Sequence, residues 1–151
     1  PANIMAVFEQ PFDRVIIDVG GDDTGATALG RYAPQLTARR EEITMLYVVN
    51  PFRPLSGTEE DIAELFGLIG QKARITPDAL VNNANLQEHT TAQDVLEGQS
   101  LLEKVSQRLN LPIAFTAGLP HLKEELPAPL QKNYFAFTPI MKPDWLVDID
   151  E

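Results

Sequence analysis

The sequence predicts an α/β protein with a three-layer, mostly parallel sheet and helices on both faces. Short apolar runs alternate with longer segments of helical periodicity, and the connections between the runs are too long for β-hairpins. Several of these runs end in polar residues, at the strand ends where open α/β sheets bind ligands. The 151 residues, 44% of them hydrophobic, suit one domain over 1–151, in which 119–151 is Pro-rich and irregular.

The first predicted strand, residues 14–19, is the stretch around which the site hypothesis is built. Its β-branched apolar run is typical of a strand buried on both faces. Asp18 lies near its end and is followed by Gly20 and Gly21, then by Asp22 and Asp23. An ionised carboxylate on a buried strand must be paired or must bind a metal. The alternative is that the glycines form a tight turn and that Asp22 or Asp23 caps the next helix.

The first half of the chain is predicted to continue with helices and one more strand. Thr58 with Asp61, or Ser56 with Glu59, fits a capping box before a helix that ends near Lys72. Its apolar residues recur at helical spacing and form one stripe: Ile62, Leu65, Phe66 and Ile69. The other predicted elements are helices at 2–10 and 24–32, the second extending to about 36, a charged turn at 39–42 and a strand at 43–49 that ends in Asn50.

The second half is predicted to contain two buried strands, one long helix and an edge strand. Thr91 and Asp94 form a capping box, and Asn110 suits the left-handed conformation at the end of that helix. Trp145 and Leu146 are predicted to anchor an acidic tail. The elements are a strand at 79–83 that ends in Asn82 and Asn83, a helix at 91–109, a strand at 112–117, a short helix at 121–126 and an edge strand at 134–140.

Composition excludes several classes of partner. The formal net charge is −10 at pH 7 and no cluster of Lys and Arg is visible, which argues against binding to nucleic acid or to an anionic membrane. No apolar run is long enough to span a bilayer. Cysteine is absent, so there is no disulfide framework, and we expect a cytoplasmic location.

Polar residues follow three of the predicted strands, and a parallel sheet would bring them to one rim. They are Asp18 with Asp22 and Asp23, then Asn50, then Asn82 and Asn83. Carboxylates at the first strand end could hold Mg²⁺ directly or through its waters. Side-chain amides offer a donor and an acceptor together, which suits the edge of a purine base. The set therefore predicts a nucleotide site.

Three of these segments resemble motifs of the MinD/ParA group of P-loop ATPases. Residues 15–21 (Val-Ile-Ile-Asp-Val-Gly-Gly) look like the Walker B strand and the switch that follows it. Residues 48–51, followed by Ser56 and a helix, are similar to the next strand and loop, and 80–83 are similar to the strand that ends in a base-contacting Asn. Residues 18–34, with 82–98, look closer still to an uncharacterised bacterial branch of CobQ/CobB/MinD/ParA-type ATP-binding proteins. The resemblance as a whole covers the chain from about 12 to 145.

The resemblance implies specific roles. Asp18 would position Mg²⁺ through water, and Asp22 and Asp23, with Gly20 and Gly21, would form the switch that senses the γ-phosphate of ATP. Asn82 or Asn83 would contact adenine, with Asn50 in the neighbouring loop. The family also implies ATP-dependent association with a second copy.

The sequence departs from the family at the phosphate loop. The pattern Gly-x-x-x-x-Gly-Lys-Ser/Thr occurs nowhere in it, so the lysine and the amide cradle for phosphates are missing. We therefore expect the chain to be the C-terminal portion of such a domain, to be inactive alone, and to need the missing part for binding of ATP and Mg²⁺. Its first residue, Pro1, is compatible with a processed start or with a cut from a longer protein.

Two alternatives come from other classes. The chain could be an autonomous α/β binding or scaffold domain without ATPase activity, which the missing phosphate loop favours. A Mg²⁺-dependent phosphatase with an aspartate nucleophile is less well supported, because Asp18-Val19-Gly20 lacks the Asp-x-Asp spacing of the common aspartyl-phosphate enzymes. An isolated half-domain would also expose apolar surface, and we expect it to self-associate.

Overall fold

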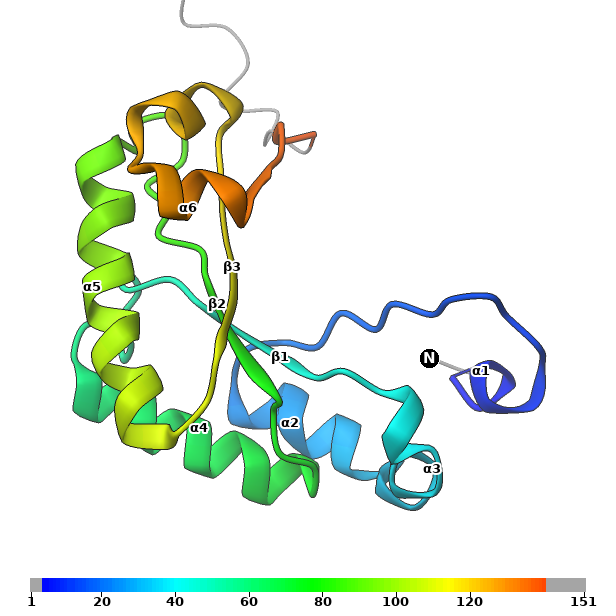
Figure 1. Ribbon diagram of the computed structural model, residues 1–151. Coiled ribbons are helices and arrows are strands. Elements are labelled where there is room, and N and C mark those ends of the chain that lie inside the picture. The colour runs from blue at the N-terminus through cyan, green and yellow to red at the C-terminus, as the bar shows by residue number, and fades with distance from the viewer. Residues whose placement is uncertain (1–3, 141–151) are drawn as a thin grey trace, which may run out of the picture.

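The computed structural model describes residues 4–140, and they form an α/β fold with an all-parallel four-stranded sheet in the order β1-β2-β3-β4 (Figure 1). This arrangement confirms the predicted fold class. Trp145 and Leu146 lie outside the described residues. In chain order the elements are α1 (Ala6–Glu9), α2 (Asp23–Gly30), α3 (Ala33–Ala38), the 3-10 helix η1 (Arg40–Glu42), β1 (Leu46–Val49), α4 (Glu59–Ala73), β2 (Ala79–Asn82), α5 (Ala92–Leu109), β3 (Ile113–Gly118), the 3-10 helix η2 (Pro120–Glu125), α6 (Ala128–Lys132) and β4 (Tyr134–Ala136).

The main hydrophobic core lies between one face of the sheet and helices α4 and α5. Tyr47 and Val49 of β1 pair in register with Leu80 and Asn82 of β2, so these four side chains share that face. Burial raises the pKa of Tyr47 to about 12, so its phenol stays neutral in the core. The core contains Ala26, Leu36, Tyr47, Val49, Ile62, Ile69, Ala73, Ile75, Leu80, Leu102 and Val105. The predicted stripe on α4 therefore faces the sheet.

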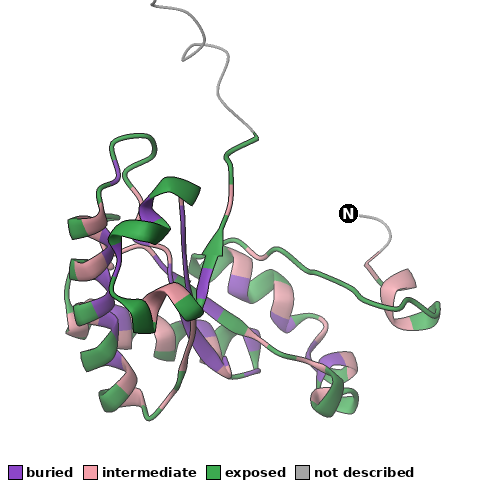
Figure 2. Ribbon diagram, turned by 45° about the horizontal axis from the view of Figure 1, so that its top comes forward, coloured by how far each residue is buried: buried purple, intermediate pink, exposed green. Residues whose placement is uncertain are grey.

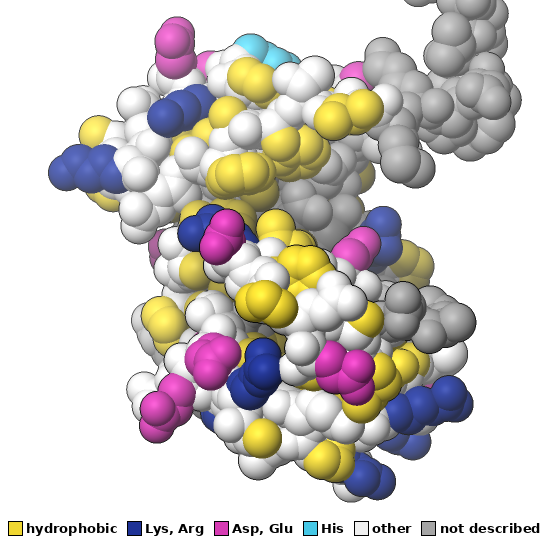
Figure 3. Space-filling view, turned by 90° about the vertical axis from the view of Figure 1, so that its right-hand side faces the viewer, with side chains coloured by type: hydrophobic (Ala, Val, Ile, Leu, Met, Phe, Trp, Pro, Cys, Tyr) yellow, Lys and Arg dark blue, Asp and Glu magenta, His cyan; other side chains and the backbone are white. Residues whose placement is uncertain are grey.

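The opposite face of the sheet leaves large apolar side chains in contact with solvent. Leu46 is 38% exposed, Val48 is 54% exposed and Phe135 is 60% exposed. Helical cover on this second face, which the sequence also predicts, is not observed over these three side chains. Figure 3, which views the molecule from the right-hand side of Figure 1, shows apolar side chains gathered among the charged ones on that side.

Thr58 and Thr91 both cap helix starts, and at Thr91 the predicted capping box is complete. Thr58 caps α4 by accepting a hydrogen bond from the Asp61 amide at 3.1 Å, so the Thr58 pairing holds rather than the Ser56 one. Thr91 and Asp94 form the reciprocal box at the start of α5. Asn110 ends α5 in the left-handed conformation, with φ 53° and ψ 46°, as predicted. Among residues 4–140, none of the helices has the length and apolar character needed to cross a bilayer.

The predicted strand at 14–19 is wrong. These residues form an extended segment outside the sheet, and Val15, Ile16 and Ile17 are 42%, 87% and 41% exposed. Figure 2 shows this part of the chain as exposed along most of its length before α2 begins. A strand exists only where a neighbouring backbone supplies hydrogen-bond partners. The outer edge of β1 has no such neighbour among the described residues, so the apolar run stays unpaired.

Asp78, just before β2, is hydrogen-bonded to Met45, just before β1. Its carboxylate accepts a hydrogen bond from the Met45 amide at 2.7 Å and pairs with the Arg40 guanidinium, while its own amide donates to the Met45 carbonyl at 2.7 Å. Burial raises the pKa of Asp78, and the hydrogen bonds from Arg40 and Met45 lower it. The lowering is the larger effect, so the pKa lies below the ordinary value of 3.8.

We expect Asp78→Asn to lower the free energy of unfolding at neutral pH, since it removes the ion pair. A carboxylate whose folded-state pKa is lowered stabilises the protein above its unfolded-state pKa, and that contribution is lost as the pH falls through the folded-state pKa. In urea titrations, the difference from wild type should therefore shrink below about pH 4. Glu64→Gln, at an exposed position on α4, is the control and should show no comparable change.

Candidate functional site at the carboxyl ends of β1 and β2

The polar residues that follow β1 and β2 lie together. The Asn50 side-chain amide donates to the Asn85 carbonyl at 2.9 Å, and the Asn85 amide donates to the Asn50 side-chain oxygen at 3.3 Å. The backbone amide of Asn83 donates to the Val49 carbonyl at 2.9 Å, which continues the strand pairing by one residue. The predicted meeting of the second and third polar strand ends on one rim is therefore present.

Asn82 points into the protein and its amide is used internally. It is fully buried, donates to the Val95 carbonyl at 3.1 Å and accepts from the Ala84 amide at 3.1 Å. A longer contact of 3.5 Å joins it to the Gln99 side-chain oxygen, which also accepts a 3.0 Å hydrogen bond from Thr116. These bonds hold α5 against β2 and β3.

Asn83, the next residue along the chain, faces the other side of the strand end. Its side-chain oxygen, unlike that of Asn82, makes no hydrogen bond within residues 4–140. The residue is half-buried, and its side-chain oxygen is enclosed without a hydrogen-bond partner in the structure. A buried acceptor without a partner costs free energy that a donor from a ligand or water would recover. Of the two predicted base contacts, Asn83 has the acceptor atom without a partner among the described residues, and the atoms that cover this oxygen would have to move before a ligand could reach it.

The acidic turn before α2 has the geometry of a helix start. The Asp22 side chain accepts from the Gly25 amide at 2.7 Å and caps the helix, which is the simpler of the two interpretations of this turn. A side chain at Gly25 would overlap the Gly20 carbonyl, so the absence of a side chain at Gly25 allows the turn to close against α2. Gly21 has open space around it, and Asp23 begins the helix in exposed surroundings.

The predicted place of Asp18 on this rim is not observed, because the segment that carries it lies outside the sheet. Asp18 is exposed, and it lines a cavity of about 190 Å³ between the 17–20 segment, α1 and α2. No hydrogen bond or ion pair within 4–140 joins it to Asn50 or Asn83. No group of three or more acids and histidines that could hold a metal occurs in that part of the chain.

Two residues that organise this rim, Gln99 and Asn85, are not among those predicted from the sequence. Gln99 falls four residues after Val95 and three before Leu102, on the buried stripe of α5. A polar residue in an apolar stripe is a visible signal of a buried hydrogen bond. Asn85 uses its backbone for the contact with Asn50, and no side-chain pattern signals that role.

Comparison of the chain with protein-family models, with curated proteins and with solved structures found no match. Any function proposed for this chain therefore depends on the geometry of its own residues.

Gly98 lets α5 approach the rim, and its replacement tests the packing there. A Cβ at Gly98 would lie 2.6 Å from the Ala84 Cβ and 2.9 Å from the Asn82 side-chain oxygen, so Gly98→Ala should destabilise the fold by about 1–3 kcal/mol. Gly67→Ala, with open space around it in α4, is the matched control and should stabilise the fold by up to about 1 kcal/mol. Denaturant unfolding of both variants measures the effect, and equal effects would contradict the close approach.

Proposed function

We propose that this chain is the ATP-binding portion of a MinD/ParA-like P-loop ATPase, with the switch and base-contacting residues but without the phosphate loop. The observation that carries the proposal is the parallel pairing of β1 with β2, which brings Asn50 and Asn83 to one rim. Open α/β sheets bind their ligands at this carboxyl edge. Asn83, with an acceptor that lacks a partner, is the proposed adenine contact.

The open edge of β1 supports the same proposal. In Figure 1 the extended segment 14–19 runs in the same direction as β1, from right to left, without pairing to it. Three of its four aliphatic side chains are exposed, as are those of Leu46 and Val48 in β1. Another parallel strand placed between the segment and β1 would pair with both and cover these side chains. A strand that leads into a Gly-rich phosphate loop is the proposed occupant.

This arrangement assigns roles to the acidic turn. With the additional strand in place, the segment 14–19 would become part of the sheet and Asp18 would come to its carboxyl edge. Asp18 would then hold Mg²⁺ through water, and the turn with Asp22 and Asp23 would sense the γ-phosphate. Without that strand the phosphates have no cradle, so the chain alone is proposed to be inactive.

A second candidate function is an autonomous α/β binding or scaffold domain. Two contacts favour it: Asp22 is occupied in capping α2, and Asn82 is occupied in holding α5. In this interpretation the polar strand ends are parts of the fold and bind no nucleotide.

Calorimetric titration of Mg-ATP into the product of the complete gene separates the two candidates. The ATPase proposal expects binding that weakens at least about tenfold in Asp18→Ala, because a magnesium contact is lost. Asp13→Ala, an exposed acid just before the segment, is the control and should bind as wild type. The chain 1–151 alone should give no binding heat. Equal affinities for the two variants, or tight binding by 1–151 alone, would contradict the proposal.

The same exposed edge leads to a proposed self-association of the chain 1–151. Aliphatic side chains on an unpaired strand edge favour pairing between copies, and a lysine there opposes it. We expect light scattering to show concentration-dependent oligomers for wild type and a shift toward monomer for Val48→Lys. Leu68→Lys, at an exposed position on α4, should leave the oligomers unchanged. A wild-type monomer at high concentration would contradict the proposal.

A further inference from the structure

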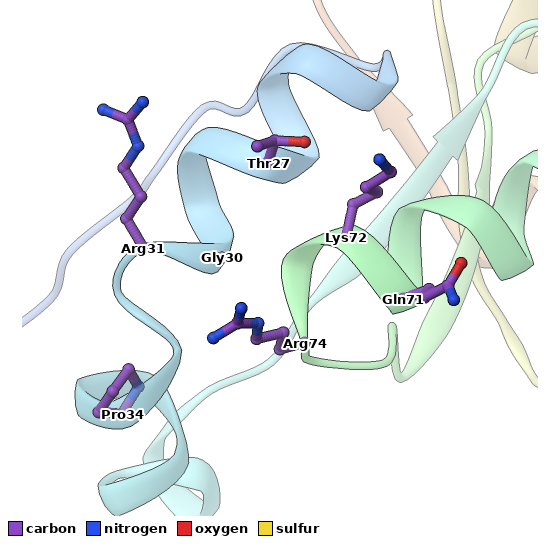
Figure 4. A pocket seen from close by; sticks show the side chains of 7 residues that line it. All are labelled: Thr27, Gly30, Arg31, Pro34, Gln71, Lys72 and Arg74. Carbon is purple, nitrogen blue, oxygen red and sulfur yellow. The ribbon is translucent and has the colours of Figure 1, made fainter.

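Three cationic residues line one groove in a protein with an excess of acidic residues. The groove has a volume of about 400 Å³ and lies between the last turns of α2 and α4 (Figure 4). Arg31, Lys72 and Arg74 line it, with Thr27, Pro34 and Gln71 beside them, and no acidic residue does. The chain has 22 acids and 12 bases, yet none of these three cations has an ion-pair partner within residues 4–140.

The close crossing of the two helices fixes the groove. A side chain at Gly30 would overlap the Lys72 carbonyl, so α2 rests directly on the last turn of α4. In Figure 4 Lys72 and Arg74 extend from the end of α4 toward α2, and Arg31 extends outward from the end of α2. The helix end sets the backbone of Lys72 and Arg74, whose exposed side chains adjust to a ligand, while Arg31 must turn inward to reach one.

Cations at helix ends have an ordinary explanation, which is the partial negative charge of a helix C-terminus. Comparing that charge with the charge of the three cations shows whether the explanation is sufficient. A helix C-terminus carries about half a negative charge, and cations placed there stabilise the helix. Both α2 and α4 end at this groove, so together they offer about one negative charge. Three unit positive charges exceed that, so the helix ends do not neutralise them and a net positive charge remains at the groove.

Arg74 supplies a second and independent observation. It ends α4 in the left-handed conformation, with φ 57° and ψ 26°. Glycine is the residue that adopts this conformation without steric cost, and asparagine is the usual substitute. An arginine here costs conformational free energy that a glycine would not. Leu55, Gln87 and Asn110 also have positive φ, so the strain at Arg74 counts only together with the other two cations of the groove.

We propose that this groove binds a dianionic phosphate group, held by Lys72 and Arg74 from α4 and by Arg31 from α2. α4 leads into the start of β2, so its end lies toward the edge of the sheet opposite to Asn50 and Asn83. The phosphate site is thus separate from the proposed nucleotide site and stands whether or not ATP binds there. The guanidinium of Arg74 and the ammonium of Lys72 give charge-assisted hydrogen bonds to phosphate oxygens.

Phosphorus NMR of the chain 1–151 with inorganic phosphate and with glycerol phosphate tests the site. Arg74→Gly removes the cation and relieves the backbone strain, so we expect a fold at least as stable as wild type and phosphate binding weakened at least about tenfold. Lys72→Ala should weaken binding as well. Lys104→Ala, on the exposed side of α5, removes the same charge elsewhere and should leave binding unchanged.

The two ligands and the pH dependence complete the test. A phosphate ester loses its second proton near pH 6, so binding should tighten between about pH 5 and pH 7, while binding of sulfate should not change. Tighter binding of glycerol phosphate than of inorganic phosphate would identify an organic phosphate as the ligand, and equal binding would identify the phosphate group itself. No binding of either, or equal weakening by Arg74→Gly and Lys104→Ala, would overturn the proposal.

Discussion

Parallel pairing of β1 with β2 is the constraint on which the rest of the structure depends. At one end of the pair Asp78 joins both strands, and at the other Asn50 bonds to the backbone of Asn85. Parallel strands need a long crossover, and α4 provides it while covering the face that carries Tyr47 and Val49. The same pairing decides which residues reach the rim, because the strand ends of a parallel pair lie at one edge.

The parts of the fold that depend on neighbouring residues could be predicted from the sequence. The caps at Thr58 and Thr91 and the left-handed Asn110 are set within a few residues, and all three are confirmed. The segment 14–19 has the composition of a buried strand and is not one. Membership in a sheet requires a partner backbone, which no local pattern supplies, so composition predicted an apolar strand at a position where pairing is absent.

Some residues of the candidate site could likewise be placed from the sequence, while others depend on how the helices pack. The positions of Asn50 and Asn83 follow from strand ends, so the sequence could place them on one rim. The orientation of Asn82 depends on where α5 sits, and the role of Gln99 depends on both strands beneath it. The cations at Arg31 and Lys72 come from different helices about forty positions apart. A groove of this kind can be found only after the two helices are packed.

The buried amides of Asn82 and Gln99 also determine how α5 can move. Apolar contacts specify one arrangement less sharply, because a core accepts other apolar side chains of similar total volume. An amide tolerates far less sliding, since a shift of one helical turn would separate Gln99 from Thr116 and Asn82 from the Val95 carbonyl. These few polar groups therefore fix both the position of α5 along its axis and its rotation relative to the sheet.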